Sequence, residues 1–399
     1  MFRSLVIGFL FGALCLMGVV APAPPARAAA TAYPVPTASA GLGRIVTIPA
    51  SAGSAHFAGS MVFIEKDAQK LGQVYWSGTQ WQIAEFAIGG STQYSQVMDV
   101  DVAGDGTIWV LVDQGRKAMR FRPWITGPGN VDYITLSSNP VGKRIRVSAS
   151  GTPWITWNYD TEKIVSINPA TLAVQTPVSP PACGPNLAVT ATELWCQAWS
   201  PGADLIRVGA GGSGGTPFPQ SGAGRDVYAL SPGPVGSVWY ARHAGGTMTS
   251  SPWLGGVGYL NATTGVYREF NTGERTAPES LVQQNGIMWF TSLGPAKGIG
   301  HLDATGHGAL TQVGGYRPTA LTVGSDGAIW FTDATTNVIV RVPVSDLQTT
   351  NVDPGAGSVF AAAQPPTIVK QTPGVTVKRA HSSVKRGKTA AFTVRVKSS

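Results

Sequence analysis

The sequence predicts an all-β protein: a seven-bladed β-propeller of four-stranded blades, followed by a short, immunoglobulin-like β segment. An apolar residue followed by an aromatic one recurs at intervals of 41 to 50 residues, which is the length of four short strands with their turns. The composition, with 50 Gly, 29 Pro and many Val, Thr and aromatic residues, favours strands and tight turns over helices. The seven pairs are Val62-Phe63, Ile108-Trp109, Pro153-Trp154, Leu194-Trp195, Val238-Trp239, Met288-Trp289 and Ile329-Trp330.

Each repeat unit shows a similar order of segments, clearest in the last one. A strand at 320–323 is followed by an Asp326-Gly327 turn, the Trp330 strand and a strand at 338–342. Asp-Gly suits a hairpin because its backbone accepts positive φ. A more variable strand, as at 265–270, closes most units. Radial packing of such sheets around a channel buries both faces, so we interpret the Trp residues as packing between blades and not as a stacking platform for bases or sugars.

Closure of the ring requires one further strand for the seventh unit. Residues 43–49 (GRIVTIP) form a strand ahead of the first unit and would tie the two ends of the chain together. Residues 346–352 are the alternative, and we favour the N-terminal strand.

The first 28 residues are typical of an export signal. A basic start at Arg3 precedes an apolar stretch at 5–20, which is short for a membrane span, and Ala26-Arg27-Ala28 offers a small-residue cleavage site. An uncleaved anchor is the alternative. No later apolar run is long enough to cross a bilayer, so we expect a secreted or cell-envelope-associated protein.

The formal charge of +8 belongs to the chain ends and not to its body. Residues 370–399 carry eight basic side chains and no acidic one, whereas residues 31–369 carry a net charge of −2. The body has no basic patch with interleaved aromatic residues, so a nucleic-acid partner is not expected.

The composition divides the chain into a propeller at 40–356, a linker at 357–369 and a basic β tail at 370–399. Two strands, at 375–377 and 391–396, resemble the opening of a bacterial immunoglobulin-like module, but a complete module needs about 100 residues. The tail is therefore a truncated module or a small appendage. Its charge is that of a solvated surface or, alternatively, one that contacts an anionic cell envelope.

Two cysteines, Cys183 and Cys196, remain after removal of the signal. In an oxidising compartment they favour one disulfide that closes a short loop; two buried thiols are the alternative. A metal site would need more ligands than these two, and no histidine lies near them in the sequence.

Two stretches carry a resemblance to a known family. The segment DGAIWFTD (326–333) with NVIVRV (337–342), and MWFT (288–291) with GIGHLD (298–303), resemble the blade repeat of virginiamycin B lyases, also called streptogramin lyases. The resemblance covers roughly residues 44–352 and is shared in part with sugar-lactonase and NHL-type propellers. It implies a seven-bladed propeller and, for the family, elimination that opens a cyclic depsipeptide antibiotic with Mg²⁺.

The resemblance also implies catalytic histidines at the start of inner strands, in a Pro-His-x-Ile context. This sequence has other residues at the matching positions: Thr319, Glu279, Met98 and Lys143. Of the five histidines, His56 falls in the least regular unit, His301 and His307 fall in the outer half of the sixth unit, and His381 falls in the tail. His243 follows the fifth Trp strand, beside Arg242.

Candidate binding residues lie at the starts of inner strands and the ends of Trp strands, because these positions border the channel mouth. Glu279 is the candidate base, and Glu279 with Asp333 would offer a hard cation only one pair of carboxylates. No phosphate loop and no nucleophile elbow is present in the sequence. The candidates are Lys143, Tyr228, Arg242, His243, Glu279 and Asp333.

Two functions follow as hypotheses. The first is an exported propeller that binds a small polar ligand or a protein surface without catalysis, which agrees with the missing histidines. The second is a lyase or lactonase-type enzyme acting on a cyclic ester, with an acid–base set rearranged around Glu279. Mg²⁺ is expected only if the lyase resemblance extends to function.

Overall fold

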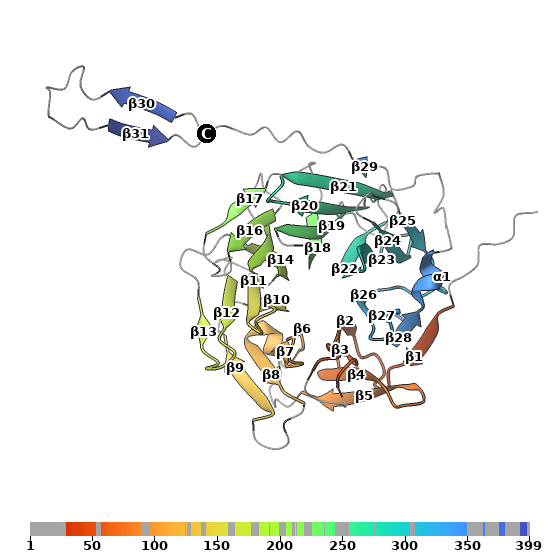
Figure 1. Ribbon diagram of the computed structural model, residues 1–399. Coiled ribbons are helices and arrows are strands. Elements are labelled where there is room, and N and C mark those ends of the chain that lie inside the picture. The colour runs from red at the N-terminus through yellow and green to blue at the C-terminus, as the bar shows by residue number, and fades with distance from the viewer. Residues whose placement is uncertain are drawn as a thin grey trace, which may run out of the picture.

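The computed structural model is a ring of seven antiparallel sheets arranged around a central axis (Figure 1). We number the sheets as blades 1 to 7 in chain order. The structure describes residues 29–52, 57–88, 96–123, 125, 129–136, 141–158, 164–176, 183–190, 192–198, 205–209, 212, 214–218, 226–234, 236–243, 255–273, 276–303, 306, 308–348, 362–363, 375–379 and 392–396.

In the first six blades the strands run outward in chain order, with the first strand beside the channel. Blade 1 comprises β2 (Leu42–Thr47), β3 (Met61–Glu65), β4 (Lys70–Trp76) and β5 (Trp81–Ala87). Blade 2 comprises β6 (Asp99–Val102), β7 (Ile108–Val112), β8 (Lys117–Phe121) and β9 (Val131–Thr135), with the 3-10 turn η1 (Asp113–Gly115). Blade 3 comprises β10 (Val141–Val147), β11 (Pro153–Asn158), β12 (Ile164–Ile167) and β13 (Val174–Gln175).

The next three blades repeat this arrangement. Blade 4 comprises β14 (Cys183–Val189), β15 (Glu193–Ala198), β16 (Leu205–Gly209) and β17 (Thr216–Phe218). Blade 5 comprises β18 (Asp226–Pro232), β19 (Ser237–His243), β20 (Gly255–Asn261) and β21 (Val266–Gly273), and the short β29 (Ala362–Ala363) pairs with β21. Blade 6 comprises β22 (Pro278–Gln284), β23 (Ile287–Ser292), β24 (Gly298–Leu302) and β25 (Gly308–Thr311).

Blade 7 is completed by the N-terminal end of the described chain. It comprises β26 (Ala320–Val323), β27 (Ile329–Asp333) and β28 (Val338–Val342), and its outer strand is β1 (Thr31–Pro34). Closure from the N-terminal side was expected, but the strand proposed for it was wrong. Residues 43–49 include most of β2, the inner strand of blade 1, and 346–348 lie in the short helix α1 (Val344–Gln348). The four residues of β1 are too short and too mixed to show a strand pattern in the sequence.

The remaining elements are a hairpin near the C-terminus. β30 (Val375–Arg379) pairs antiparallel with β31 (Phe392–Val396), at the two strand positions expected from the sequence. Their membership in an immunoglobulin-like module stays a prediction.

The tryptophans pack between blades, as the sequence predicts. Trp330, for example, is fully buried and packs against Ile45 and Phe63 of blade 1. Seven separate apolar clusters fill the spaces between neighbouring blades. Each Trp on a second strand therefore belongs to the core that holds its blade to the next one.

Blade 1 departs from the alignment made on the sequence. Phe63 lies opposite Gly72, just as Phe290 in blade 6 lies opposite Gly300, so Phe63 matches the residue after the Trp. Val62 therefore takes the Trp position, and the equivalence assumed between Phe63 and the Trp residues was wrong. A shift of one residue places a strand side chain on the other face of the sheet, and Phe63 accordingly faces blade 7.

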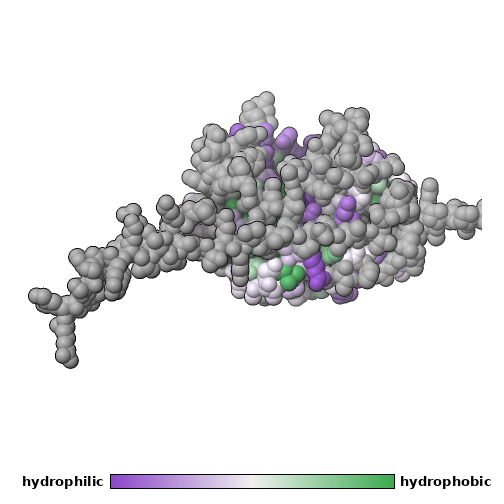
Figure 2. All heavy atoms as spheres, turned by 90° about the horizontal axis from the view of Figure 1, so that it is seen from above, coloured by the Kyte–Doolittle hydropathy of each residue, from purple (hydrophilic) through white to green (hydrophobic). Residues whose placement is uncertain are grey.

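Cys183 and Cys196 form a disulfide, as expected, with their Cα atoms 5.5 Å apart. It joins β14 to β15 beside an irregularity in their pairing between Cys183 and Leu187. Within the described ranges, no helix has the length and apolar character needed to cross a bilayer. Figure 2 views the ring across its thickness, and hydrophilic and intermediate residues predominate among those coloured on that face.

Candidate functional site

The inner strands bring one residue from each blade to the same level of the channel wall, and this happens at two levels. In each blade, the residue of the second level is the inner-strand residue that lies opposite the second residue after the Trp position of the next strand: Asp99 lies opposite Leu111, and Ser280 lies opposite Thr291. The residue of the first level is the one immediately before it in the sequence. We call these levels the upper ring and the second ring. The upper ring is Gly43, Met98, Lys143, Pro185, Tyr228, Glu279 and Thr319; the second ring is Arg44, Asp99, Arg144, Asn186, Ala229, Ser280 and Ala320.

Several residues of the upper ring are the extra residue of a β-bulge. The pairing of β10 with β11 skips Lys143, that of β18 with β19 skips Tyr228, and that of β22 with β23 skips Glu279. A bulge re-aims its side chain away from the regular alternation of the strand. The fold therefore uses the same device in several blades to turn a residue at the strand start toward the channel mouth.

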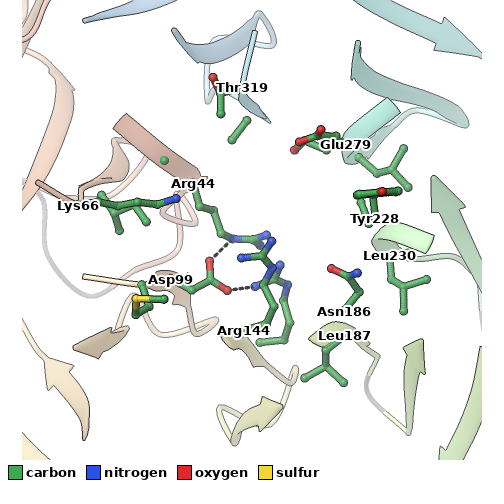
Figure 3. Close-up of a pocket in the computed structure, with 18 residues that line it drawn as sticks. Arg44, Lys66, Asp99, Arg144, Asn186, Leu187, Tyr228, Leu230, Glu279 and Thr319 are labelled. Atoms are coloured by element: carbon green, nitrogen blue, oxygen red, sulfur yellow. Dashed lines mark hydrogen bonds and ion pairs between the residues drawn. The ribbon is translucent and has the colours of Figure 1, made fainter. Parts of the chain in front are cut away.

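Both rings line one pocket in the channel, with a volume of about 180 Å³ (Figure 3). All seven residues of the second ring border it, and so do Tyr228, Glu279, Met98 and Thr319 of the upper ring. Lys66, from the turn after β3, and Arg146 complete its charged lining.

The charges gather on the wall formed by blades 1 to 3. Asp99 accepts hydrogen bonds from Nη1 of Arg146 at 2.6 Å and from the amide of Ile145 at 3.0 Å, and its other oxygen lies 3.9 Å from Nε of Arg44. Asp101 accepts from Nη2 of Arg44 at 3.3 Å and from the Val147 amide at 2.8 Å. The two carboxylates of β6 thus hold one arginine of each neighbouring blade. Figure 3 shows Asp99 with its dashed contacts to these arginines.

The pKa shifts of this wall reflect crowded positive charge. Burial is the main cause that lowers the pKa of Arg44; repulsion by Arg146 and Arg144 lowers it too, and attraction by Asp101 and Asp99 opposes the shift. Burial and Arg144 likewise lower the pKa of Lys66. Burial alone would raise the pKa of Asp99, but Arg146, Arg44 and Arg144, with the Ile145 amide, hold it below its ordinary value.

The opposite wall, from blades 5 and 6, carries three of the sequence-predicted candidates together. The rings of Tyr228 and His243 stack with centroids 3.5 Å apart, and Nε2 of His243 lies 3.8 Å from Oε1 of Glu279. His243 is buried behind Tyr228, whereas the Glu279 side chain is 36% exposed. Burial raises the pKa of Glu279 despite the attraction of Arg317 and Arg144.

The other three candidates, Lys143, Arg242 and Asp333, do not line this pocket. Lys143 lies on the upper ring, but its neighbour Arg144 borders the pocket instead. Arg242 is fully buried and its Nη1 lies 3.2 Å from Oε2 of Glu269, on the outer strand of blade 5. The buried Asp333 accepts hydrogen bonds from the amides of Arg317, Thr335 and Thr336, which is a turn-capping role.

The positions that the resemblance matches to the family's histidines, Met98, Lys143, Glu279 and Thr319, hold equivalent places in the strand register of their blades. Met98, Glu279 and Thr319 all border the pocket. His301 lies on β24 with its ring 5.1 Å from that of Trp289, away from the channel, and burial lowers its pKa. His56, His307 and His381 fall outside the described residues.

The sequence reasoning missed the charged residues of the second ring. Arg44, Asp99 and Arg144 each stand one residue after an upper-ring position. The sequence alignment of the repeats contained the information: the column one residue after the upper-ring positions holds Arg, Asp and Arg in blades 1, 2 and 3. Lys66 carries no repeat signal, since it reaches the pocket from a turn.

Mg²⁺, which the family resemblance implies, does not fit these residues. The ion takes hard oxygen ligands, usually carboxylates, in near-octahedral geometry. Glu279 is a single carboxylate among arginines, the oxygens of Asp99 are taken by Arg146, Arg44 and an amide, and those of Asp333 by backbone amides. Among the residues that the structure describes, no group of three or more His, Cys, Asp or Glu side chains is placed to hold a metal ion.

A second pocket opens on the outer side of the ring, where β1 and blade 7 meet blade 1. This seam groove, of about 590 Å³, is lined by Tyr33, Trp76, Trp81, Ser325, Asp326 and Arg341. Nε of Arg341 donates to Asp326 at 2.6 Å, and the other oxygen of Asp326 accepts from Nε1 of Trp330 at 3.1 Å. The charges of the seam groove are therefore paired within it.

Comparison with known proteins identifies the fold. No known family model matches the sequence, and no curated protein sequence matches it. Among solved structures, virginiamycin B lyase from Staphylococcus aureus is similar with a TM-score of 0.61 at 18% identity, over 79% of this chain and 98% of the lyase. A catalytically inactive histidine-to-alanine variant of that lyase with quinupristin gives 0.60 at 17% identity, over 79% and 98%.

A solved structure of a different protein is also similar. YCF48 bound to a D1 peptide has a TM-score of 0.53 at 12% identity, over 78% of this chain and 96% of that one. The resemblance to virginiamycin B lyases noted in the sequence is thus confirmed as a likeness of fold. At these identities the comparison carries the architecture and not the chemistry.

Proposed function

We propose that this protein is an exported propeller that binds a small polar ligand in its channel without catalysis. The observation that carries the proposal is the second ring, in which Arg44, Asp99 and Arg144 from three successive blades face Asn186 and Ser280 across one pocket. A concave site with a few convergent polar groups is typical of ligand binding. The upper-ring residues Met98, Glu279 and Thr319, at positions where the lyase family has histidines, agree with binding rather than with its elimination chemistry.

Export is supported by the disulfide and by the first 28 residues, which have the pattern of a signal. A disulfide is rare in reducing compartments. A protein surface as the partner, and contact between the basic tail and an anionic envelope, remain alternatives that the channel itself does not favour.

A second function is favoured by the Glu279–His243 pair. A carboxyl with a raised pKa, 3.8 Å from an imidazole nitrogen, is an arrangement suited to general acid–base chemistry. A lyase or lactonase-type enzyme that opens a cyclic ester would use Glu279 as the base. We place it second because Asp99 and Asp333, the carboxylates that could act together with Glu279, are held by arginines and backbone amides.

The binding proposal is tested with the chain from residue 29 onward. Thermal unfolding is followed with a panel of small polar compounds in anionic, neutral and cationic sets, for the wild type and for Tyr228→Ala. A compound that raises the unfolding temperature of the wild type, and has a much smaller effect on the variant, supports a channel site. Absence of any stabilising compound, or equal shifts in both proteins, would overturn it.

The enzymatic alternative has its own test. The protein is incubated with quinupristin and Mg²⁺, and the products are separated and weighed by mass spectrometry. Elimination gives a linear product of unchanged mass and hydrolysis adds one water. Turnover that disappears in Glu279→Gln would establish the enzyme, and absence of turnover at high protein concentration would leave binding.

A further inference from the structure

The channel pocket contains more positive charge than its own carboxylates neutralise. Its blade 1 to 3 wall brings together Arg44, Lys66, Arg144 and Arg146. Among the described residues, the carboxylates in ion pairs with these cations are Asp99 and Asp101, and Asp67 acts on Lys66 only from beyond ion-pair distance. Asp99 and Asp101 are engaged by Arg146 and Arg44 at 2.6 and 3.3 Å. Two positive charges are left over on this wall.

The surplus is carried by Arg144 and Lys66. Within the described part of the chain, neither side chain has a carboxylate within ion-pair distance or a hydrogen bond. From the blade 1 to 3 wall, Arg144 acts electrostatically on Lys66 and Arg44 beside it and on Glu279 of the opposite wall (Figure 3). Partly buried like charges repel strongly when water screens them poorly.

An arginine without a counter-ion beside a lysine is an arrangement that favours an oxyanion. The guanidinium presents a planar fork of donors that matches a carboxylate or phosphate, and a neighbouring ammonium adds a point charge. Resting on the proposed function, we propose that the ligand of the channel carries a carboxylate or phosphate group, which binds Arg144 and Lys66 on the blade 1 to 3 wall.

Glu279 sets a second condition on the ligand. It faces this wall from blade 6, so an anion bound to Arg144 is repelled by its charge unless the ligand places a hydrogen-bond donor there. The succinate dianion has no such donor, whereas inorganic phosphate near neutral pH keeps a P–OH group that can donate to Glu279. Replacing Glu279 by Gln is therefore expected to strengthen the binding of succinate, an outcome opposite to that of removing an ordinary ligand contact.

The test is calorimetric titration of inorganic phosphate and of succinate into the chain from residue 29 onward, with ionic strength held constant by chloride. We expect saturable binding of one anion per chain, weakened on the order of tenfold in Arg144→Gln and in Lys66→Gln, because each removes a charge-assisted contact. Arg144→Lys is expected to retain part of the affinity, and Glu279→Gln to increase the affinity for succinate. The better-bound anion identifies the chemical group.

The matched control is Arg341→Gln, which removes a cation from the seam groove. Unchanged anion affinity in this variant supports the proposal, whereas an equal loss there would show non-specific charge attraction and overturn it. If neither anion binds but a neutral or cationic compound stabilises the wild type more than Tyr228→Ala, the anion is wrong and the ligand-binding function stands. If no compound of any charge binds in the channel, both are wrong.

Discussion

The channel pocket and the seam groove differ in how their charges are balanced. In the seam groove Arg341 and Asp326 pair with each other, and Asp326 also accepts from Trp330, which is fully buried in the interface between blades 7 and 1. In the channel Arg144 and Lys66 have no such partner among the described residues. The seam groove is the larger of the two pockets. The feature that favours the channel pocket as the proposed ligand site is therefore its unbalanced charge and not its size.

The paired charges of the seam groove and the buried Trp330 beside it indicate that the seam holds blades 7 and 1 together. Trp330→Ala tests this structural role and has the largest expected effect. Trp330 is fully buried, with Tyr33 stacked on it at 5.4 Å and Trp81 at 4.8 Å. We expect its truncation to lower the free energy of unfolding by about 3–5 kcal/mol in urea denaturation, because it leaves a cavity at the ring closure.

Trp76→Ala is the matched control in the same groove. Trp76 is 53% exposed, so its removal is expected to change the free energy of unfolding by about 0.5 kcal/mol or less. Equal losses of unfolding free energy in the two variants would contradict the structural role of Trp330. A loss of ligand affinity at the channel pocket in folded Trp330→Ala would contradict the independence of the two pockets.

Removal of the disulfide tests how much it stabilises the inner strand of blade 4. Cys183 and Cys196 clamp the irregular start of β14, from which Asn186 reaches the pocket. A Cys183→Ser and Cys196→Ser double variant is expected to lose about 3 kcal/mol of stability, the loop-closure entropy of a short loop. Urea denaturation of the oxidised wild type and the double variant measures it. A difference under about 1 kcal/mol would mean that the bulge is held without the covalent link.

Glu65, at the end of β3 in blade 1, differs from the paired Arg341 and Asp326 of the seam groove because its carboxylate forms no ion pair among the described residues. It is fully buried, neither of its oxygens has a hydrogen-bond partner among the described residues, and burial, with repulsion by Glu85, raises its pKa to about 7. A folded pKa above the unfolded one means that its contribution to stability is complete below the unfolded pKa and is lost as the pH rises through 7.

Glu65→Gln is therefore expected to be more stable than the wild type at pH 8, by roughly 2–3 kcal/mol, with the difference shrinking toward pH 4. Thermal unfolding of both proteins across this pH range measures the difference. A constant difference across the range would show that Glu65 does not titrate differently on folding.

The repeat made the architecture predictable, because the Trp on the second strand of six blades and the turns before it recur at blade length. The disulfide and the tail strands followed from the cysteine count and from apolar alternation. Two parts of the fold could not be predicted. The first is β1, whose four residues show no alternation of apolar and polar side chains. The second is the register of blade 1, where Val62 holds the Trp position and the aromatic Phe63 beside it was aligned there instead.

The site was only half predictable. The sequence located Tyr228, His243 and Glu279, which the fold brings together, but it offered no means to see that Arg242 turns outward to Glu269 or that Asp333 caps a turn. The charged second ring lay one residue beyond the positions chosen. A β-bulge adds one residue to a strand, and its effect on which side chains face the channel depends on pairing that no single strand reveals.

The most direct test of the charge comparison is the stability of Arg144→Gln and Arg341→Gln without ligand, at about 20 mM and about 1 M salt. We expect Arg144→Gln to raise the unfolding temperature at low salt, since it removes an uncompensated cation, and Arg341→Gln to lower it slightly, since it breaks an ion pair worth up to about 1 kcal/mol. Both differences should shrink at high salt. A lower unfolding temperature for both variants would contradict the account, because it would mean that the charge of Arg144 is already neutralised within the protein.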